Sequence, residues 1–129
     1  MTNDELAAFY RRYNACCNEH RFDDLSESVA PDVVINGTDR GLVAYADGLR
    51  AVVRSFPDYR WELRHLVVDA PWIAVHIADT GTHRGDFLGV EATGRFVSTP
   101  EFAFYRVEAG RIAEVWGMAF HVLLLDQLQ

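Results

Sequence analysis

The first part of the chain repeats apolar residues with the period of an α-helix. Thr2 and Glu5 have the spacing of a capping box, in which a hydroxyl and a carboxylate satisfy two free backbone N–H groups at a helix start. Apolar residues then follow at helical spacing, namely Leu6, Phe9, Tyr10, Tyr13 and Cys17. The pattern predicts an amphipathic helix that ends at about His20.

Three further segments precede a change of period. Residues 22–29 predict a short second helix, which ends before Pro31 because the residue ahead of a proline avoids the helical conformation. Residues 32–36 form a brief apolar run that favours a short strand. Residues 42–56 carry the apolar face of a third helix, and Pro57 ends it.

From Tyr59 onward the apolar residues alternate with a period of two, which is typical of β-strands. The expected strands cover residues 59–68, 72–80, 96–107 and 112–119, and a closing helical turn is expected at 123–128. Helices followed by a meander of strands indicate an α+β fold, with the N-terminal helices packed on one face of a curved antiparallel sheet. No linker or repeat interrupts the pattern, so we expect residues 1–129 to form a single domain.

Charge narrows the range of partners. The chain has 12 Lys and Arg against 19 Asp and Glu, a formal net charge of −7 at pH 7. Its longest basic run is Arg11-Arg12, whereas nucleic acids and anionic membranes bind extended basic patches. Its apolar runs are far shorter than the roughly 18 residues of a transmembrane helix. We therefore expect a small-molecule partner, with no nucleic acid and no membrane.

Cysteine usage and the N-terminal sequence favour the cytoplasm. Cys16 and Cys17 are adjacent, a spacing that supports neither a disulfide framework nor a zinc site. The sequence MTNDEL at the start is acidic and lacks the apolar segment of a signal peptide. We therefore expect a reduced, cytoplasmic protein.

The sequence contains none of the common motifs for cofactors or nucleophiles. It has no P-loop, no G-x-S-x-G elbow and no H-E-x-x-H helix. His65, His76 and His83 fall on or near neighbouring strands, but their spacing matches no metal-ligand signature. We expect no metal and no cofactor.

Glu101 is the first candidate for chemistry. It lies in the middle of the longest expected strand, on the face that also carries Val97, Ala103 and Tyr105. Two interpretations remain open, because this face meets either solvent or an internal cavity. If it lines a cavity, the desolvated carboxyl group is suited to proton transfer.

Two segments carry a family resemblance. Residues 81–95 read GTHRGDFLGVEATGR, and residues 104–116 read FYRVEAGRIAEVW. In order and spacing they resemble the SnoaL-like polyketide cyclase family, whose pattern is G-T-H-x-G-x-x-x-G-x-x-A/P-T-G-K/R followed by I-F-R-x-x-x-G-K/R-I-x-E-x-W. The resemblance implies the NTF2-like fold, a cone in which helices and a curved sheet enclose one pocket. It also implies cofactor-free aldol or ester cyclisation of a small apolar or polyketide-like molecule, and a homodimer formed through the sheet.

The chain departs from the family pattern after Trp116. Cyclases of the family carry a catalytic Asp as W-x-x-x-D, and this chain has Phe120 at that position. Proton transfer would then come from another residue, and we expect Glu101 first, followed by His76 and His83. His83 also has a structural interpretation, as the anchor of its glycine-rich loop.

Aromatic and polar side chains near the expected pocket are candidates for binding the ligand, because such groups combine an apolar body with a polar end. They are Tyr13, Asn36, Trp61, His65, Tyr105, Trp116, Met118 and Phe120. The resemblance directs Trp116, Met118 and Phe120 toward the pocket.

Three functions remain open. The first is a cofactor-free cyclase or isomerase that acts on an enolisable substrate by acid/base chemistry. The second is a non-catalytic domain that binds a small ligand, which the missing Asp favours. The third is an epoxide hydrolase of the same fold, for which Asp79, Arg95 and Asp86 are the available relay residues. Two titratable groups that converge in the pocket would favour an enzyme, and an entirely apolar pocket would favour a binding domain.

Overall fold

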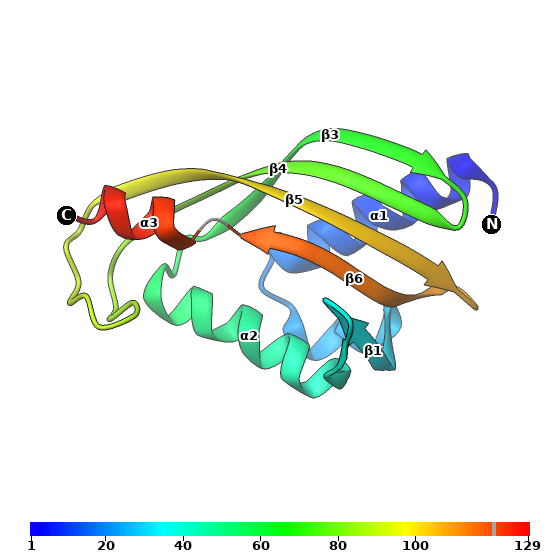
Figure 1. The fold of residues 1–129 in the computed structure, drawn as a ribbon, viewed down its shortest axis with the longest axis horizontal. Helices are drawn as coiled ribbons and strands as arrows, with labels where there is room; N and C mark the ends of the chain where they lie inside the picture. Colours follow the sequence, from blue (N-terminus) through cyan, green and yellow to red (C-terminus); the bar gives the residue numbers. More distant parts are fainter. Residues whose placement is uncertain (120) are drawn as a thin grey trace.

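The computed structural model describes residues 1–119 and 121–129, in which a curved six-stranded sheet is covered by helices (Figure 1). The helices are α1 (Asn3–Asn18), α2 (Gly41–Ser55) and α3 (His121–Gln127), with a 3₁₀ helix η1 (Phe22–Glu27). The strands are β1 (Val29–Ile35), β2 (Thr38–Asp39), β3 (Arg60–Asp69), β4 (Trp72–Thr82), β5 (Phe96–Glu108) and β6 (Arg111–Ala119). The α+β arrangement predicted from the sequence is confirmed.

The sheet has the strand order β2-β1-β6-β5-β4-β3. Strands β3 to β6 form the expected antiparallel meander, but β1 pairs parallel to β6, so the sheet is mixed. The expected second helix is the 3₁₀ helix η1, and β1 begins at Val29 and includes Pro31. The register between β1 and β6 shifts between Val29 and Val34. This irregularity accommodates the missing N–H of Pro31.

Helix α1 begins with the predicted capping box. The Thr2 hydroxyl accepts the Glu5 N–H at 3.1 Å, and the Glu5 carboxylate accepts the Thr2 N–H at 2.9 Å. The buried face of the helix consists of Leu6, Phe9, Tyr10, Tyr13, Cys16 and Cys17. A well-defined start and a fully buried face hold α1 firmly against the sheet.

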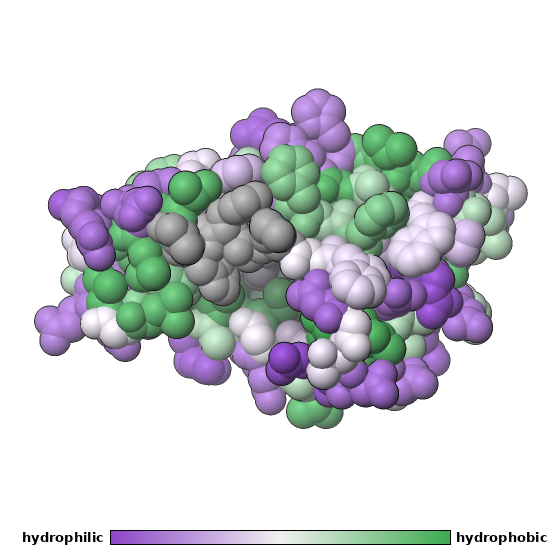
Figure 2. All heavy atoms as spheres, viewed as in Figure 1, coloured by the Kyte–Doolittle hydropathy of each residue, from purple (hydrophilic) through white to green (hydrophobic). Residues whose placement is uncertain are grey.

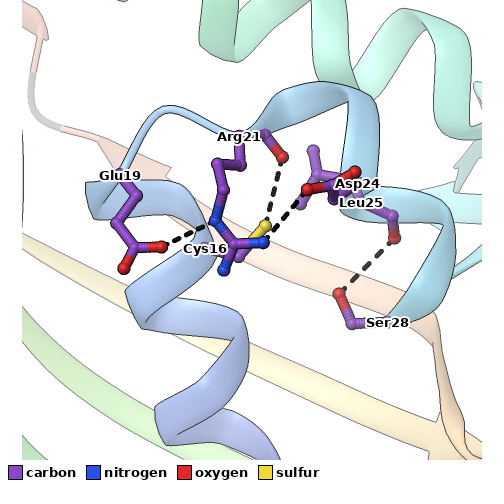
Figure 3. A network of polar contacts seen from close by, with 6 residues as sticks. All are labelled: Cys16, Glu19, Arg21, Asp24, Leu25 and Ser28. Atoms are coloured by element: carbon purple, nitrogen blue, oxygen red, sulfur yellow. Dashed lines mark hydrogen bonds and ion pairs between the residues drawn. The ribbon is translucent and has the colours of Figure 1, made fainter.

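The turn after α1 is held by polar contacts (Figure 3). The Arg21 guanidinium lies between the carboxylates of Glu19 and Asp24, with N–O distances of 2.6 and 3.0 Å. The carbonyl oxygen of Arg21 accepts the Cys16 thiol at 3.1 Å. These contacts fix the direction in which the chain leaves α1 toward η1.

Helix α2 is less deeply buried against the rest of the fold than α1. Only Ala46 and Ser55 of its residues are fully buried. Its other apolar side chains that pack on the core are half-buried, namely Leu42, Tyr45, Leu49, Val52 and Val53. Its contacts run mainly to β1 and η1. The packing of α2 against the rest of the fold is therefore looser than that of α1.

The two faces of the sheet differ in character. The face toward the helices carries the core, including Ile77 of β4 and Tyr105 of β5. The opposite face, called here the outer face, carries Phe102 and Phe104 of β5 and Trp116 of β6, which are 51 %, 47 % and 44 % exposed. Figure 2 shows hydrophobic and near-neutral side chains gathered over β5 and β6, bordered by hydrophilic ones. The outer face is therefore an apolar surface in contact with solvent.

Two further observations concern the cysteines and the length of the helices. Cys16 and Cys17 are free and buried, in agreement with the absence of a disulfide framework in the sequence. Within the part of the chain that the structure describes, no helix has the length and apolar character needed to cross a membrane.

Candidate functional site

Glu101 lines an internal cavity. The pairing of β4 with β5 sets Glu101 opposite Ile77, on the face toward the helices. The cavity has a volume of about 30 Å³, which is room for one water molecule. It is lined by Tyr10, Tyr13, Asn14, Cys17, Tyr45, Leu49, Trp61, Ile77, Glu101 and Tyr105. Four of the residues expected at the site therefore come together here, namely Glu101, Tyr13, Trp61 and Tyr105.

A second carboxyl group lies behind Glu101. Asp79 of β4 is 1 % exposed and lies within hydrogen-bonding reach of Glu101 and Tyr59. Burial raises the pKa of Asp79 to about 10, and the hydrogen bond and charge of Glu101 contribute in the same direction. Its Oδ1 atom has no hydrogen-bond partner among the described residues. Because burial and the neighbouring Glu101 both favour its protonated form, Asp79 is the group of the pair that is suited to hold a proton at neutral pH.

Four tyrosine hydroxyls surround the same cavity. Tyr13 of α1 and Tyr45 of α2 are hydrogen-bonded to each other, and Tyr10 of α1 lies within hydrogen-bonding reach of Tyr105 of β5. The rings of Tyr10, Tyr13 and Tyr105 pack together, with centroid distances of 5.3, 5.6 and 5.8 Å. Burial raises the pKa of all four phenols, so they remain protonated hydrogen-bond donors at neutral pH.

Two asparagines of α1 fix the helix to the cavity wall at Trp61. Asn14 donates its side-chain N–H to the Trp61 carbonyl at 3.0 Å, and Asn18 accepts the Trp61 N–H at 2.7 Å. Cys17 lies between these two asparagines in the sequence. Burial raises the pKa of its thiol to about 12, so this group remains neutral. These hydrogen bonds fix β3 to α1 where both elements border the cavity.

His83 lies outside the cavity, at the base of the glycine-rich loop. It is fully buried, and its Nδ1 accepts the Thr93 N–H at 3.1 Å, which places the ring proton on Nε2. Its backbone pairs with Arg95 and Gly94 at 2.9 and 2.8 Å, and its ring packs on Phe56 at a centroid distance of 5.3 Å. These contacts favour the interpretation of His83 as the anchor of the loop.

Three of the expected residues lie on the outer face. His65 of β3 and His76 of β4 are register partners, and their Nδ1 atoms are 3.0 Å apart. Trp116 is the register partner of the exposed Phe104 and donates its indole N–H to Glu114 at 2.7 Å. The expectation that Trp116 faces the pocket is therefore wrong, because the register between β5 and β6 turns it to the opposite face. His76 is separated from Glu101 by the sheet.

Asn36 has a structural contact near the same face. Its side-chain oxygen accepts the N–H of Gly117 at 2.9 Å, so it extends the pairing of β1 with β6. Met118 stands opposite Phe102 in the register of β5 and β6. Phe120 lies outside the described residues.

The relay expected for an epoxide hydrolase is not assembled. Asp79 is buried beneath the helices, whereas Asp86 is exposed in the loop after β4. The Arg95 guanidinium donates to the carbonyl oxygens of Gln127 and Gln129 at the end of the chain. The three side chains therefore do not form one site.

Comparison with known proteins shows the family. The sequence profile of the SnoaL-like polyketide cyclases matches residues 7–128. The chain belongs to this family. No protein of curated function matches it.

Solved structures of similar proteins share the whole fold. A SnoaL-like polyketide cyclase from Agrobacterium tumefaciens has 32 % identical residues and a TM-score of 0.85, with 100 % of both chains covered. IdmH from Streptomyces antibioticus, a proposed polyketide cyclase, has 27 % identity and a TM-score of 0.86, covering 95 % of this chain and 96 % of that one. AclR from Streptomyces galilaeus, a proposed hydroxylase, has the same fold at 24 % identity and a TM-score of 0.89, covering 98 % and 97 %.

Three residues of the candidate site are not expected there from the sequence, namely Asp79, Tyr10 and Tyr45. Of these, only Asp79 is a candidate for chemistry in the sequence, as a relay residue of an epoxide hydrolase. The signal for Asp79 is its position in β4, since it shares the alternation of the buried Ile73 and Ile77. A carboxyl group at a core position requires a partner or a function. In the described ranges, no group of three or more His, Cys, Asp or Glu side chains is arranged to hold a metal ion.

Proposed function

We propose that the chain is a cofactor-free enzyme of the cyclase or isomerase type, in which Glu101 removes a proton from a small enolisable substrate. The supporting observation is that Glu101 lines an internal cavity while a second carboxyl group, Asp79, lies behind it within hydrogen-bonding reach. Burial and the neighbouring Glu101 hold the pKa of Asp79 well above its usual range, so Asp79 is suited to be the acid of the pair and Glu101 the base. A carboxylate base beside a carboxylic acid that stays neutral is suited to proton transfer next to a carbonyl group.

The two carboxyl groups have different roles because only one reaches the cavity. Glu101 borders the space in which a substrate carbon would lie, and it acts as the base. Asp79 lies behind it and does not touch the substrate, so it is a positioning residue that orients the carboxylate by a hydrogen bond. In an aldol cyclisation the resulting enolate carbon attacks a second carbonyl carbon of the same molecule. The proton taken up by Glu101 then goes to the alkoxide that forms.

The lining of the cavity favours a small, largely apolar substrate that carries a carbonyl oxygen. Half of the residues that line the cavity are aromatic, and their phenol hydroxyls can donate hydrogen bonds to an oxygen atom. In its closed form the cavity has room for one water molecule, so a substrate enters by displacing part of the wall. A polyketide-like diketone, compatible with the chemistry named for the relatives, fits these requirements.

Hydrogen–deuterium exchange at carbon tests the proposal without knowledge of the natural substrate. NMR follows the replacement of the α-protons of 2,4-pentanedione, a simple 1,3-diketone, in deuterated water. We expect the protein to accelerate exchange, and Glu101→Gln to lower the protein-dependent rate about 10²–10⁴-fold through loss of the general base. The control is His76→Gln on the outer face, which is expected to keep the rate. A protein without any acceleration, or a Glu101→Gln variant with the wild-type rate, contradicts the proposal.

Binding without catalysis is the second candidate function. It is favoured by one observation, namely that Phe120 stands where the family pattern W-x-x-x-D has its carboxylate. Under this alternative, apolar ligands raise the melting temperature while the exchange of carbon-bound protons stays at the rate of the buffer. The paired carboxyl groups at the cavity favour the enzyme.

We also propose a homodimer formed through the outer face. Phe102, Phe104 and Trp116 are large, exposed and close in register, and the indole N–H of Trp116 is already bonded to Glu114. The aromatic rings therefore present a mainly apolar surface, of a kind that a partner usually covers in soluble proteins. Sedimentation at micromolar concentration is expected to show a dimer, and a species of 14.6 kDa alone contradicts it.

We also propose that the protein is located in the cytoplasm. The adjacent Cys16 and Cys17 are free thiols, which persist in a reducing compartment. Cell fractionation tests this location.

A further inference from the structure

One hydrogen bond joins α1 to α2 at the cavity. The hydroxyls of Tyr13 and Tyr45 form it, and both residues line the cavity that Glu101 borders. Tyr13 belongs to the fully buried face of α1, whereas Tyr45 belongs to the half-buried face of α2. The bond therefore connects a firmly packed element to a loosely packed one.

The two hydroxyls have one donor that their mutual bond does not use. They carry two protons, and the hydrogen bond between them uses one. The other has only the Cys17 sulfur, a weak acceptor, within hydrogen-bonding reach of Tyr13, so a carbonyl oxygen would displace it. Burial raises the pKa of both Tyr13 and Tyr45, and neither phenol ionises near neutral pH. The pair is thus a neutral O–H donor beside a carboxylate base, inside a site with little water.

We infer that the Tyr13–Tyr45 pair binds the carbonyl oxygen of the substrate and stabilises the negative charge that develops there when Glu101 removes the proton. The inference rests on the proposed function. When the substrate oxygen enters between the two hydroxyls, their mutual bond breaks and both donate to that oxygen. No proton leaves the pair, and the charge of the former carboxylate is transferred to the enolate oxygen. Preorganised donors in a site of low polarity stabilise such a charge more than water does.

The anchoring of α2 explains how the pair opens. At the C-terminal end of the helix, the Ser55 carbonyl oxygen accepts the N–H groups of Arg84 and Gly85 at 2.9 and 3.0 Å. The Ser55 hydroxyl donates to the carbonyl oxygen of Asp86 at 2.6 Å. The segment that carries Tyr45 lies ten residues earlier, next to the buried Ala46 and on the half-buried face of α2. An outward tilt about Ser55 therefore parts the hydroxyl pair and enlarges the cavity, and closure on the substrate assembles the site.

The second hydroxyl pair provides a contrast within the same cavity. Tyr10 and Tyr105 join α1 to β5, and their rings are 1 % and 3 % exposed with centroids 5.3 Å apart. Both partners belong to firmly packed elements, so a movement of α2 leaves this pair closed. Tyr105→Phe is therefore the matched control for Tyr45→Phe, since each change removes one hydroxyl from the cavity wall.

A phenolate serves as a stable stand-in for the enolate. Glu101→Gln reproduces the charge of the site after proton removal, because glutamine is neutral like the protonated base. Absorbance titration with 4-nitrophenol measures binding of the coloured phenolate. We expect the Glu101→Gln protein to bind it at least about tenfold more tightly than the wild type. Adding Tyr13→Phe or Tyr45→Phe is expected to weaken binding about tenfold to a hundredfold. Adding Tyr105→Phe, which also removes a hydroxyl from the cavity wall, is expected to weaken it less than either change, and adding His76→Gln on the outer face is expected to leave it unchanged.

Two results would overturn the role of the tyrosine pair. It is overturned if the Glu101→Gln protein binds no phenolate, or if Tyr105→Phe weakens binding as much as Tyr45→Phe does. Thermal melting confirms that each variant is folded, and slower amide hydrogen exchange in residues 41–55 with bound phenolate reports closure of α2. If Glu101→Gln abolishes deuterium exchange into 2,4-pentanedione but binds no phenolate, only the role of the tyrosine pair is wrong. If Glu101→Gln keeps that exchange, the proposed function itself is wrong.

Discussion

The imidazole rings of His65 and His76 form one flat, hydrogen-bonded pair across β3 and β4. Their Nδ1 atoms are 3.0 Å apart, their centroids are 5.2 Å apart and their planes differ by 13°. The centroid distance nearly equals the Nδ1 distance plus the two ring radii, so the rings lie edge to edge. One Nδ1 therefore donates and the other accepts. The ring of His76 also packs against Phe102 at a centroid distance of 4.9 Å, in the middle of the outer face.

Loss of this histidine pair is expected to weaken the proposed homodimer. The double variant His65→Ala/His76→Ala removes two hydrogen-bonded rings, one of which packs against Phe102 in the middle of the outer face. Sedimentation is expected to show more monomer for the double variant than for the wild type at the same concentration. A variant dimer as tight as the wild type contradicts the prediction.

Asp79→Asn is expected to stabilise the protein above about pH 5. Burial raises the pKa of Asp79 to about 10 in the folded protein, whereas the ordinary value for the free side chain is 3.8. Between these values the folded state binds more protons than the unfolded state, so the free energy of unfolding falls as the pH rises. Asparagine keeps the shape without the charge. We expect a gain of at least about 1 kcal/mol at about pH 8, seen as several degrees in melting temperature.

The same substitution is expected to have little effect on stability at about pH 3, where Asp79 is largely protonated in both the folded and the unfolded state. Melting curves recorded across this range therefore separate a charge effect from a packing effect. An equal gain at both pH values would show that relief of strain, and not loss of a buried charge, causes the stabilisation.

Substitutions of Asp79 are also expected to affect the rate of proton transfer, and this effect depends on whether the new side chain can donate a hydrogen bond to Glu101. In Asp79→Asn the new side-chain amide still donates an N–H to Glu101, so this variant is expected to keep most of the exchange rate, while Asp79→Ala lowers it about tenfold or more. In the wild type, loss of the Asp79 proton at about pH 10 places a second negative charge beside the base and alters the rate. Asp79→Asn lacks this feature. A pH–rate profile of the three proteins checks it, and identical profiles for all three would exclude a positioning role.

The local periodicity of the sequence predicts the helices and the strand meander, but not which sheet face encloses the site. Alternation places Glu101 with Ala103 and Tyr105, and the packing of α1 makes that face internal. The orientation of Trp116 depends on the register between β5 and β6, which alternation within one strand does not report. The parallel pairing of β1 with β6 joins distant segments of the chain for the same reason.

The candidate site is predictable where a polar residue interrupts an apolar pattern, and not where residues come from separate elements. Glu101 is found by its position in an apolar strand, and Asp79 could be found by the same rule. Tyr13 and Tyr45 are ordinary members of two amphipathic helices, 32 positions apart, and only the folded arrangement brings their hydroxyls together. Their role therefore requires the structure.

Two glycines on either side of the α2 anchor are expected to respond with opposite signs to the addition of a methyl group. A Cβ on Gly85 would lie 2.5 Å from the Arg54 carbonyl oxygen, and both are backbone positions that no rotamer change relieves. Gly85→Ala is therefore expected to destabilise the protein by about 2–4 kcal/mol and to speed amide exchange at the end of α2. A Cβ on Gly48, inside α2, meets no described heavy atom within 4 Å. Gly48→Ala is expected to stabilise by up to about 1 kcal/mol through helix propensity. Thermal melts with hydrogen exchange of residues 41–55 measure both variants. The added methyl group is the same in both variants. A loss of stability in both would therefore mean that α2 is packed more tightly than its half-buried face indicates. An outward tilt about Ser55 would then be too costly to admit a substrate.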